Sequence, residues 1–433
     1  MSTSTQSLRA ALAERAPGAV TEATEGDAVA GVRPRVVVAP GGAEEVAAVL
    51  AFADREGLKV LPRGGGTQLG LGFPPSGGDI LLSTARLNAI VEHAPHDQTV
   101  SVLPGLPLAD LRAALARTRQ WLALDPPSSP GATLGGLIAA SPSGPRRLRY
   151  GGVRDQIIGV RVALADGTIA KGGGKVVKNV AGYDLPKLFT GSLGTLGVIV
   201  GATFRLYPLA AASRTLTLRA PDLAALGELA LRVTASQLVP AALDIAGTSD
   251  EDTAIFVVSF ETGGDAAAEE QASEARALAG SLGATAETLS GATEDAFWER
   301  LDAGLAPPIA GAVGNSLLLK ASVVPTGVAN WLARLGAAAR EGDVHTRWRA
   351  HAGHGLVLAR LDGDAEALIA LVEPLRAAAH AEQGSLVVTD APPAIAGRVD
   401  VWGPSAALDV MRELKARFDP HGTLNPGRFV GGI

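Results

Sequence analysis

Glycine is far denser in two stretches of this sequence than in the rest of the chain. Of the 53 glycines among 433 residues, seven lie within residues 62–78 and fifteen within residues 131–197. Glycine is used where the backbone takes a positive φ or lies close against another group. We therefore predict that both stretches are loops built for close contact, either with a ligand or with neighbouring backbone.

The length and composition predict two folded domains. A single hydrophobic core rarely serves more than about 250–300 residues, and 47% of this chain is hydrophobic while 19% is charged. A net charge of −6 argues against a nucleic-acid-binding surface. The absence of cysteine excludes disulfides, thiolate nucleophiles and cysteine-ligated iron–sulfur clusters within the chain.

The sequence predicts neither a secretory signal nor a membrane span. The first residues lack the basic and apolar regions of a signal peptide, and no stretch approaches 18 uninterrupted apolar residues. We therefore expect a cytoplasmic protein that contacts a membrane, if at all, peripherally through a partner. Four of the seven lysines lie between residues 171 and 187, which indicates either a solvated basic loop or a surface for an anion or acidic partner.

Hydrophobic periodicity predicts strands and helices up to about residue 210, with the first glycine-rich stretch directly after a strand. The expected strands cover residues 36–39, 58–61, 98–103, 160–164, 168–171, 196–200 and 203–207, and the expected helices cover 46–53 and 108–115.

From about residue 211 the glycines thin out, and alanine-rich helices alternate with strands. This pattern indicates a second, α/β domain, followed by a loop-rich segment from residue 391 onward. The expected strands cover residues 255–260, 317–324, 356–361 and 386–389, and the expected helices cover 222–235, 266–282, 328–340 and 364–380.

The first glycine-rich stretch is suited to an anion. Three successive glycines, Gly64–Gly66, leave several backbone N–H groups free to point into one concavity, which is how backbone nests bind phosphate. The stretch is neither a Walker A loop nor a dinucleotide fingerprint, because it lacks GxxxxGK[ST] and the last glycine of GxGxxG. It is either a ligand-binding loop or a flexible connection.

The second stretch has small residues at most positions between Pro130 and Ala139. Such a segment can lie flat against a ligand or pack closely against a helix. It is followed by Arg154-Asp155 and by Gly191–Ile199, each a modest signal when taken alone.

Taken in order, these motifs resemble a known family. PRGGGT (62–67), PGATLGG (130–136), RYGGVRDQIIG (149–159), ADGT (165–168) and KNVAGYDLPKLFTGSLGTLGVI (178–199) are similar to the FAD-binding, or PCMH-type, domain of the vanillyl-alcohol-oxidase-type flavoproteins. DPHGTLNPGR (419–428) resembles the C-terminal return to that domain.

The resemblance implies an α+β fold in which a PCMH-type FAD-binding domain of two α+β subdomains carries an α/β cap domain with an antiparallel sheet. The implied boundaries are an N-terminal helical lead at 1–27, the FAD-binding domain at 28–210, the cap at 211–390 and the return at 391–433.

The resemblance also implies where FAD binds. Residues 62–68 would hold the diphosphate, residues 130–136 would run along the diphosphate and flavin, and residues 194–199 would line the ribose or adenine. Thr67 stands where some relatives carry a flavin-linking histidine, so FAD is expected to be non-covalent. The implied cofactor-binding residues are Pro62, Arg63, Gly64, Gly65, Gly66, Thr67, Gln68, Pro130, Gly131, Ala132, Thr133, Gly135, Gly136, Arg154, Asp155, Gly194, Thr195, Gly197, Val198, Ile199 and Asn425.

The cap departs from the catalytic members of the family. Those that oxidise 2-hydroxy acids carry HxGDGNLH, whose histidines and nearby acid hold a metal or polarise the substrate. This chain has HAGHGLVL at 351–358, so the first histidine remains as His351, the acid is His354 and the second histidine is Leu358. Leucine neither ligates a metal nor accepts a proton, and no acid lies among residues 345–358, so no metal site is expected.

Oxidation of a 2-hydroxy acid by a flavin needs a cation for the carboxylate and a base for the hydroxyl proton. Lys320, Arg347 and Arg349 are candidate cations, although each can equally be a solvated charge. His351 is the candidate base, or else a relic or surface residue. We take Lys320 and His351 as the catalytic candidates.

The run from Lys178 to Ile199 most resembles the GlcE-type subunit of glycolate oxidase. That resemblance implies an FAD subunit whose complex oxidises glycolate to glyoxylate, together with a catalytic flavoprotein subunit and an iron–sulfur subunit that takes up the electrons. The alternatives are a stand-alone FAD-linked oxidase or dehydrogenase of a small 2-hydroxy acid such as lactate, and an assembly subunit that has lost its flavin.

Overall fold

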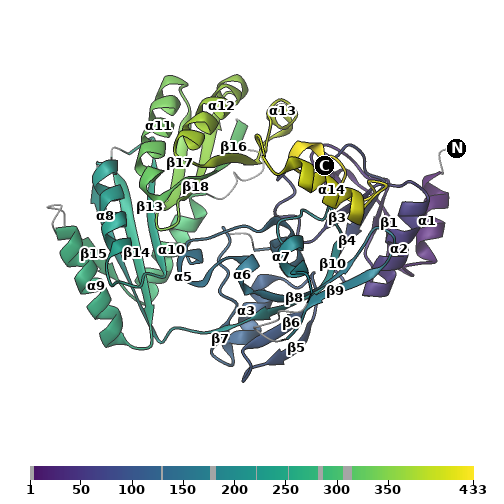
Figure 1. The fold of residues 1–433 in the computed structure, drawn as a ribbon, viewed down its shortest axis with the longest axis horizontal. Coiled ribbons are helices and arrows are strands. Elements are labelled where there is room, and N and C mark those ends of the chain that lie inside the picture. The colour runs from purple at the N-terminus through teal and green to yellow at the C-terminus, as the bar shows by residue number, and fades with distance from the viewer. Residues whose placement is uncertain are drawn as a thin grey trace.

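The chain forms two lobes, which a computed structural model describes for residues 4–127, 130–175, 182–220, 222–251, 253–280, 286–305 and 315–433 (Figure 1). Most of residues 4–210, with the C-terminal segment, makes up the first lobe, and residues 211–390 make up the second, here called the cap. Lys178 and the rest of residues 176–181, within the lysine-rich stretch, lie outside the described residues.

The first lobe begins with a small, mostly parallel sheet. Its strand order is β1-β2-β4-β3, and both β2 and β3 run parallel to β4. Two helices pack on it through Leu8, Leu12, Val46 and Leu50, all fully buried. The elements are α1 (Thr5–Ala13), β1 (Val20–Glu22), β2 (Val36–Val38), α2 (Ala43–Arg55), β3 (Val60–Arg63) and β4 (Ile80–Ser83).

A five-stranded antiparallel sheet completes the first lobe, in the order β5-β6-β10-β8-β9. Its core includes Leu111, Leu134, Val162 and Phe204. Its elements are β5 (Ile90–Ala94), β6 (Thr99–Val102), α3 (Leu108–Ala116), α4 (Leu134–Ala140), β8 (Ile157–Ala163), β9 (Ile169–Gly173), α7 (Leu185–Phe189) and β10 (Val198–Arg205), with short α5 (Arg147–Tyr150), α6 (Val153–Gln156), β7 (Gln120–Trp121) and β11 (Tyr207–Pro208) beside them.

One expectation about this sheet was wrong. The sequence predicted separate strands at 196–200 and 203–207, but the structure has one continuous strand, β10, over Val198–Arg205. The register shifts between Ile199 and Gly201. A glycine inside a strand often marks such a bulge, so the chain bends at Gly201 without leaving the sheet.

The cap is an eight-stranded antiparallel sheet in the order β15-β12-β14-β13-β17-β18-β16-β19. Helices α8, α9, α11 and α12 cover one face around a core that includes Phe256 and Trp331. The bounds are β12 (Ala212–Ala220), α8 (Leu223–Ala235), β13 (Ala242–Thr248), β14 (Ala254–Thr262), α9 (Asp265–Gly280), β15 (Ala286–Leu289), α10 (Ala292–Ala303), β16 (Asn315–Ser322), α11 (Val328–Glu341), β17 (His345–His351), β18 (Leu356–Gly363), α12 (Ala365–Ala381) and β19 (Ser385–Asp390).

The other face of the cap sheet is turned toward the first lobe, and α5 and α10 lie on that side (Figure 1). Side chains alternate between the faces of a strand, so Trp348 and Ala350 of β17 enter the helix-covered core while Arg349 and His351 point toward the first lobe. This inner face therefore carries buried charge.

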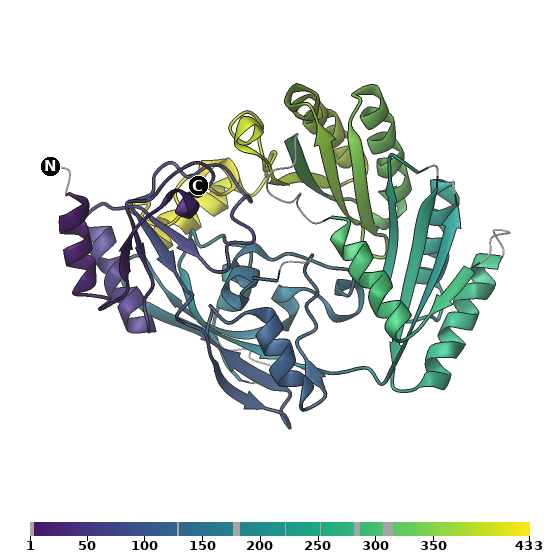
Figure 2. The ribbon, with the colours of Figure 1, turned by 180° about the vertical axis from the view of Figure 1, so that it is seen from behind.

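The C-terminal segment returns to the first lobe, beside the N-terminal helices in both views (Figures 1 and 2). After α13 (Pro393–Ala396) and α14 (Leu408–Phe418), Leu424 pairs in parallel with Val60 at the edge of β3. The Val60 N–H donates to the Thr423 carbonyl at 2.8 Å, and the Asn425 N–H donates to the Val60 carbonyl at 2.9 Å. The tail thus adds a single-residue bridge to the edge of the first sheet.

Within the described ranges, no helix has both the length and the apolar character needed to cross a membrane.

Candidate functional site

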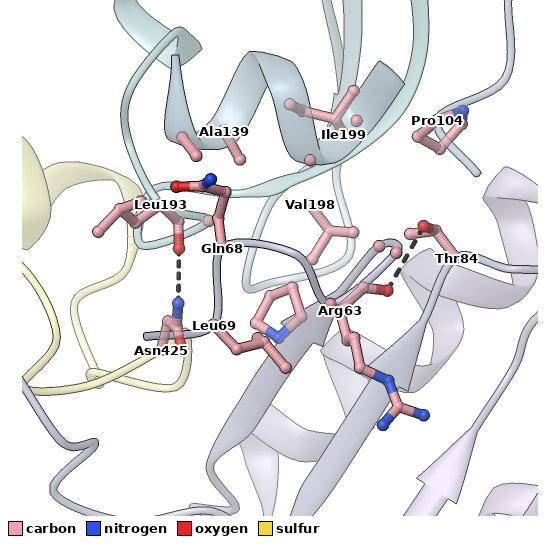
Figure 3. Close-up of a pocket in the computed structure, with 18 of the residues that line it drawn as sticks. Arg63, Gln68, Leu69, Thr84, Pro104, Ala139, Leu193, Val198, Ile199 and Asn425 are labelled. Atoms are coloured by element: carbon pink, nitrogen blue, oxygen red, sulfur yellow. Dashed lines mark hydrogen bonds between the residues drawn. The ribbon is translucent and has the colours of Figure 1, made fainter. Parts of the chain in front are cut away.

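A pocket lies between the two sheets of the first lobe, where the loop after β3 faces the start of β10 and helix α4 (Figure 3). The Asn425–Leu193 hydrogen bond marks one end of the view and the Thr84–Arg63 hydrogen bond the other. Of the predicted cofactor residues, the pocket is lined by Pro62, Arg63, Gly64, Gly65, Gly66, Thr67, Gln68, Gly135, Gly136, Gly194, Gly197, Val198, Ile199 and Asn425.

The loop after β3 offers backbone donors to this pocket. Among the described residues, none accepts a hydrogen bond from the backbone N–H of Gly66, Thr67 or Gln68. Gly66 has a φ of +78°, which glycine adopts without strain. Successive free N–H groups in a turn form a nest for an anion, so the loop fits a phosphate-containing ligand.

The glycines also allow two backbone segments to touch. A Cβ on Gly65 would lie 1.7 Å from the Gly131 carbonyl oxygen, and a Cβ on Gly64 would lie 2.4 Å from Thr133 Oγ1. The Gly65 N–H donates to Thr133 Oγ1 at 3.2 Å. Close packing and pocket lining are therefore properties of the same residues, and the two interpretations drawn from the sequence are not exclusive.

Some predicted cofactor residues lie outside the lining. Pro130, Gly131, Ala132 and Thr133 lie behind the loop, where Ala132 and Thr133 are buried. Buried Thr195 donates its hydroxyl to the Ser192 carbonyl at 2.7 Å. Arg154 and Asp155 are exposed, and Asp155 accepts from the Gly152 N–H at 2.8 Å. Their roles toward a cofactor stay predictions.

Other lining residues were not among the predicted cofactor-binding residues, although Ala139, Leu193 and Arg428 lie within segments that the sequence analysis singled out. The fold alone brings them to the pocket. They are Leu69, Thr84, Pro104, Ala139, Ala140, Leu193 and Arg428.

In the cap, His351 has the acidic partner that its own segment lacks. Asp244 of β13 lies opposite His351 of β17 in the sheet register. Its two oxygens contact His351 Nδ1 at 2.8 Å and Arg349 Nε at 2.7 Å, and all three side chains are buried. Burial would raise the pKa of Asp244, but the charges of His351 and Arg349 outweigh it and lower that pKa to about 2.

This cluster still presents free polar atoms. Within the described part of the chain, Arg349 Nη2, His351 Nε2 and His354 Nε2 are buried without a hydrogen-bond partner. Burial, together with the nearby charge of His351, lowers the pKa of His354 to about 4. Lys320 of β16 lies on the same face, and burial and nearby Arg147 lower its pKa. Arg347, the third candidate cation, lies at the opposite end of β17 from His351.

A second cluster joins the cap to the first lobe. Glu261 of β14 accepts from Arg146 Nε at 2.5 Å and from the Tyr150 hydroxyl at 2.7 Å. Burial, followed by the charge of Glu261, raises the pKa of Tyr150, so the phenol stays a donor. Asp125 accepts from the Arg146 N–H at 2.9 Å, yet burial raises its pKa to about 6.

Across the ranges that the structure covers, no three His, Cys, Asp or Glu side chains are arranged to hold a metal ion.

Comparison with protein families matches both lobes. A family model described as an FAD binding domain matches residues 34–173. A second, described as the C-terminal domain of FAD linked oxidases, matches residues 211–387 and 402–429.

Curated relatives align over nearly the whole chain. Glycolate oxidase subunit GlcD of Bacillus subtilis (strain 168) is 28% identical over 416 residues, which is 91% of this chain and 88% of that protein. D-lactate dehydrogenase of Archaeoglobus fulgidus is 31% identical over 428 residues, 91% of each chain.

Among solved structures, the 4-ethylphenol oxidase from Gulosibacter chungangensis, in its isoeugenol complex, matches with a TM-score of 0.76. The two chains are 16% identical, and the match covers 99% of this chain and 97% of the oxidase, so the similarity is evidence for the fold alone. The expected α+β architecture with an antiparallel cap is confirmed. This chain therefore belongs to the FAD-linked oxidases with a PCMH-type FAD-binding domain, which are FAD-dependent oxidoreductases, and FAD is its cofactor.

Proposed function

We propose that the pocket between the two first-lobe sheets is where this chain holds FAD. The observation that carries the proposal is the run of unpartnered N–H groups at Gly66–Gln68 inside a pocket lined by seven glycines. The N–H groups would hold the diphosphate, and Val198, Ile199 and Leu193 supply apolar surface for the rings. With Thr67 in the loop, the attachment is non-covalent.

Acid precipitation of the purified yellow protein tests this attachment. All of the FAD is expected in the supernatant, and flavin retained in the pellet would contradict it. A colourless protein that does not take up added FAD would contradict the proposed site itself.

The proposed reaction is the oxidation of a small 2-hydroxy acid, supported by the relatives named for glycolate and D-lactate. Bound FAD supplies the hydride acceptor. If this chain itself carries out the oxidation, Lys320, which has no hydrogen bond or ion pair among the described contacts, would bind the substrate carboxylate. Asp244 accepts from Nδ1 of His351, so in the neutral imidazole Nε2 is left to accept the hydroxyl proton.

We further propose that the chain works as a GlcE-type FAD subunit of a glycolate oxidase complex, beside a catalytic flavoprotein subunit and an iron–sulfur subunit. Two observations support it. In the cap, Arg349 bonds to Asp244, and Glu261 bonds to the first lobe, so these charges already have partners. The chain also has no cysteine to hold an iron–sulfur cluster. The flavin would then relay electrons, in a cytoplasmic assembly that meets the membrane through its partners.

Stopped-flow reduction with glycolate tests the relay. The flavin of the isolated chain is expected to stay oxidised over the turnover time of the complex, and to be reduced once the catalytic subunit is added. Reduction of the isolated chain at the rate of the complex would contradict it.

The alternative is a stand-alone FAD-linked dehydrogenase of a 2-hydroxy acid such as lactate, favoured by the 31% identity to a D-lactate dehydrogenase over 91% of the chain. It predicts turnover without partners, and a loss of about 100-fold or more when the base or the cation is removed in His351→Ala or Lys320→Ala. An isolated chain that is inert with D-lactate and glycolate excludes it.

A further inference from the structure

The pocket of the first lobe is lined by two arginines that differ in their partners. Arg63 Nη1 lies 2.9 Å from Asp27 Oδ1, so its charge is compensated within the protein. The pKa of Asp27 is lowered, first by the Thr24 backbone N–H and also by Arg63. Arg428 forms no ion pair with any carboxylate among the described residues.

Arg428 is buried, with 3% of its surface exposed. Its Nη2 donates to the Leu69 carbonyl at 2.7 Å and also to the Leu71 carbonyl. Its Nε and Nη1 are buried and have no partner in the part of the chain that the structure describes. A guanidinium carries five N–H donors, and buried charges are normally paired, so this side chain lacks an acceptor.

The electrostatics of Arg428 agree with that geometry. Burial lowers its pKa to about 10, and no acidic group opposes this shift. Asp390 is a carboxylate that lies against the same loop, since its Oδ1 would be 1.9 Å from a Cβ placed on Gly70. The cation that acts on Asp390 is Arg360, not Arg428. Within the described residues, no carboxylate therefore compensates the charge of Arg428.

We propose that Arg428 is the counter-cation for a negatively charged group of the bound FAD. The inference rests on the proposed FAD site and adds to it the residue that neutralises the cofactor. Arg428 bonds to the carbonyls of Leu69 and Leu71, which come just after the free N–H groups of Gly66–Gln68 in the same loop. Arg428 therefore lies at the end of the nest. Two groups of FAD carry suitable charge, the diphosphate and the pyrimidine end of the reduced ring.

Two variants test the proposal, with a matched control. Arg428→Gln removes the charge but keeps an N–H₂ donor for the Leu69 and Leu71 carbonyls, and Arg428→Lys keeps the charge. Arg412→Gln makes the same change in the same C-terminal segment, at a side chain that is 56% exposed and paired with Asp409. Each apoprotein is titrated with FAD and, separately, with ADP, and FAD binding is followed by quenching of flavin fluorescence.

Arg428→Gln is expected to bind FAD about 10- to 100-fold more weakly, the usual effect of losing a charged hydrogen-bond partner. Arg428→Lys is expected to recover at least half of that loss on a logarithmic scale, and Arg412→Gln to bind like the wild type. If the partner is the diphosphate, ADP binding weakens in parallel with FAD binding.

If the partner is the reduced ring, ADP binding is unchanged and the bound flavin becomes harder to reduce. A tenfold loss of preference for the reduced form is about a 30 mV drop in a two-electron potential. The potential is measured on the FAD-loaded variants, so this readout does not depend on turnover.

Arg428→Gln with wild-type affinity for FAD and ADP and an unchanged potential would overturn the inference. Equal loss of FAD in the Gln and Lys variants, together with equal loss of apoprotein stability, would also overturn it and assign Arg428 a purely structural role. A wild-type chain that fails to bind FAD would instead refute the proposed function.

Discussion

Asp125, which is 14% exposed, and Asp244, which is fully buried, are carboxyl groups at the interface of the two lobes, yet their pKa values move in opposite directions. Burial raises the pKa of Asp125 to about 6, although Arg146 opposes the shift. The pKa of Asp244 falls to about 2, because His351 and Arg349 both bond to it directly and outweigh its burial.

This difference predicts a pH effect on stability. Between its ordinary pKa of 3.8 and about 6, Asp125 holds a proton in the folded protein that the unfolded chain has released. Stability from this group therefore falls as pH rises through that window. Asp125→Asn keeps an acceptor for the Arg146 N–H but does not titrate, so its urea-unfolding free energy is expected to lack this slope. An unchanged slope in the variant would contradict the assignment.

A second residue-scale prediction concerns Gly65. Its φ is not positive, so alanine meets no backbone strain, but the new Cβ would lie 1.7 Å from the Gly131 carbonyl. Overpacking of this kind costs about 1–3 kcal/mol, so Gly65→Ala is expected to lower the unfolding temperature of the apoprotein. Gly263→Ala is the control, because Gly263 is exposed with nothing within 4 Å of its Cβ position. Equal unfolding temperatures for the two variants would show that the loop is free to move away.

At the scale of elements, the C-terminal tail is attached to the edge of the first sheet by the bridge between Leu424 and Val60. Leu424 is fully buried in that core, and the residues flanking it reach the pocket through Asn425 and Arg428. Leu424→Ala is expected to cost about 2–5 kcal/mol of unfolding free energy and to weaken FAD binding, because both pocket residues lose their support. Val410→Ala, at a side chain that is 60% exposed on α14, is expected to change neither.

Helices and strands were predictable from the sequence where only one face of the element is buried. The expected helices at 328–340 and 364–380 correspond to α11 and α12, whose apolar faces cover the cap sheet. Strand β17 was missed, since its inner face carries Arg347, Arg349 and His351, and alternating charge resembles a surface loop. Arg349 and His351 are buried while Arg347 is exposed, and nothing local in the sequence encodes this difference.

The site residues that could be found from the sequence lie next to each other in the chain, and those that were missed are far from their partners. Residues 62–68 and 194–199 are contiguous and rich in glycine, so their pattern is visible without the fold. Arg428 is a single residue brought from 359 positions away to Leu69. Asp244 meets His351 only through strand pairing across 107 positions. No sequence window contains either pair.

For the whole molecule, Glu261 connects the cap to the first lobe through Arg146 and Tyr150. Glu261→Gln leaves Arg146 without its closest carboxylate, and because Arg146 is 30% exposed the loss is expected to be smaller than the roughly 3–5 kcal/mol of a fully buried pair. The variant is expected to unfold in two calorimetric transitions, the cap separating from the first lobe. Glu251→Gln, which breaks an exposed pair with Arg219, is expected to unfold like the wild type. One unchanged transition in Glu261→Gln would show that other contacts hold the lobes together.

The tail that pairs with β3 has a consequence for biosynthesis. The pocket needs both Leu69 and Arg428, and the ribosome makes the first of these long before the second. The pocket is therefore incomplete until the ribosome has made residue 428, even if the N-terminal sheet has already formed. Capture of the cofactor in a complete pocket therefore waits for this segment, because a chain that stops short of residue 425 lacks one wall of the pocket.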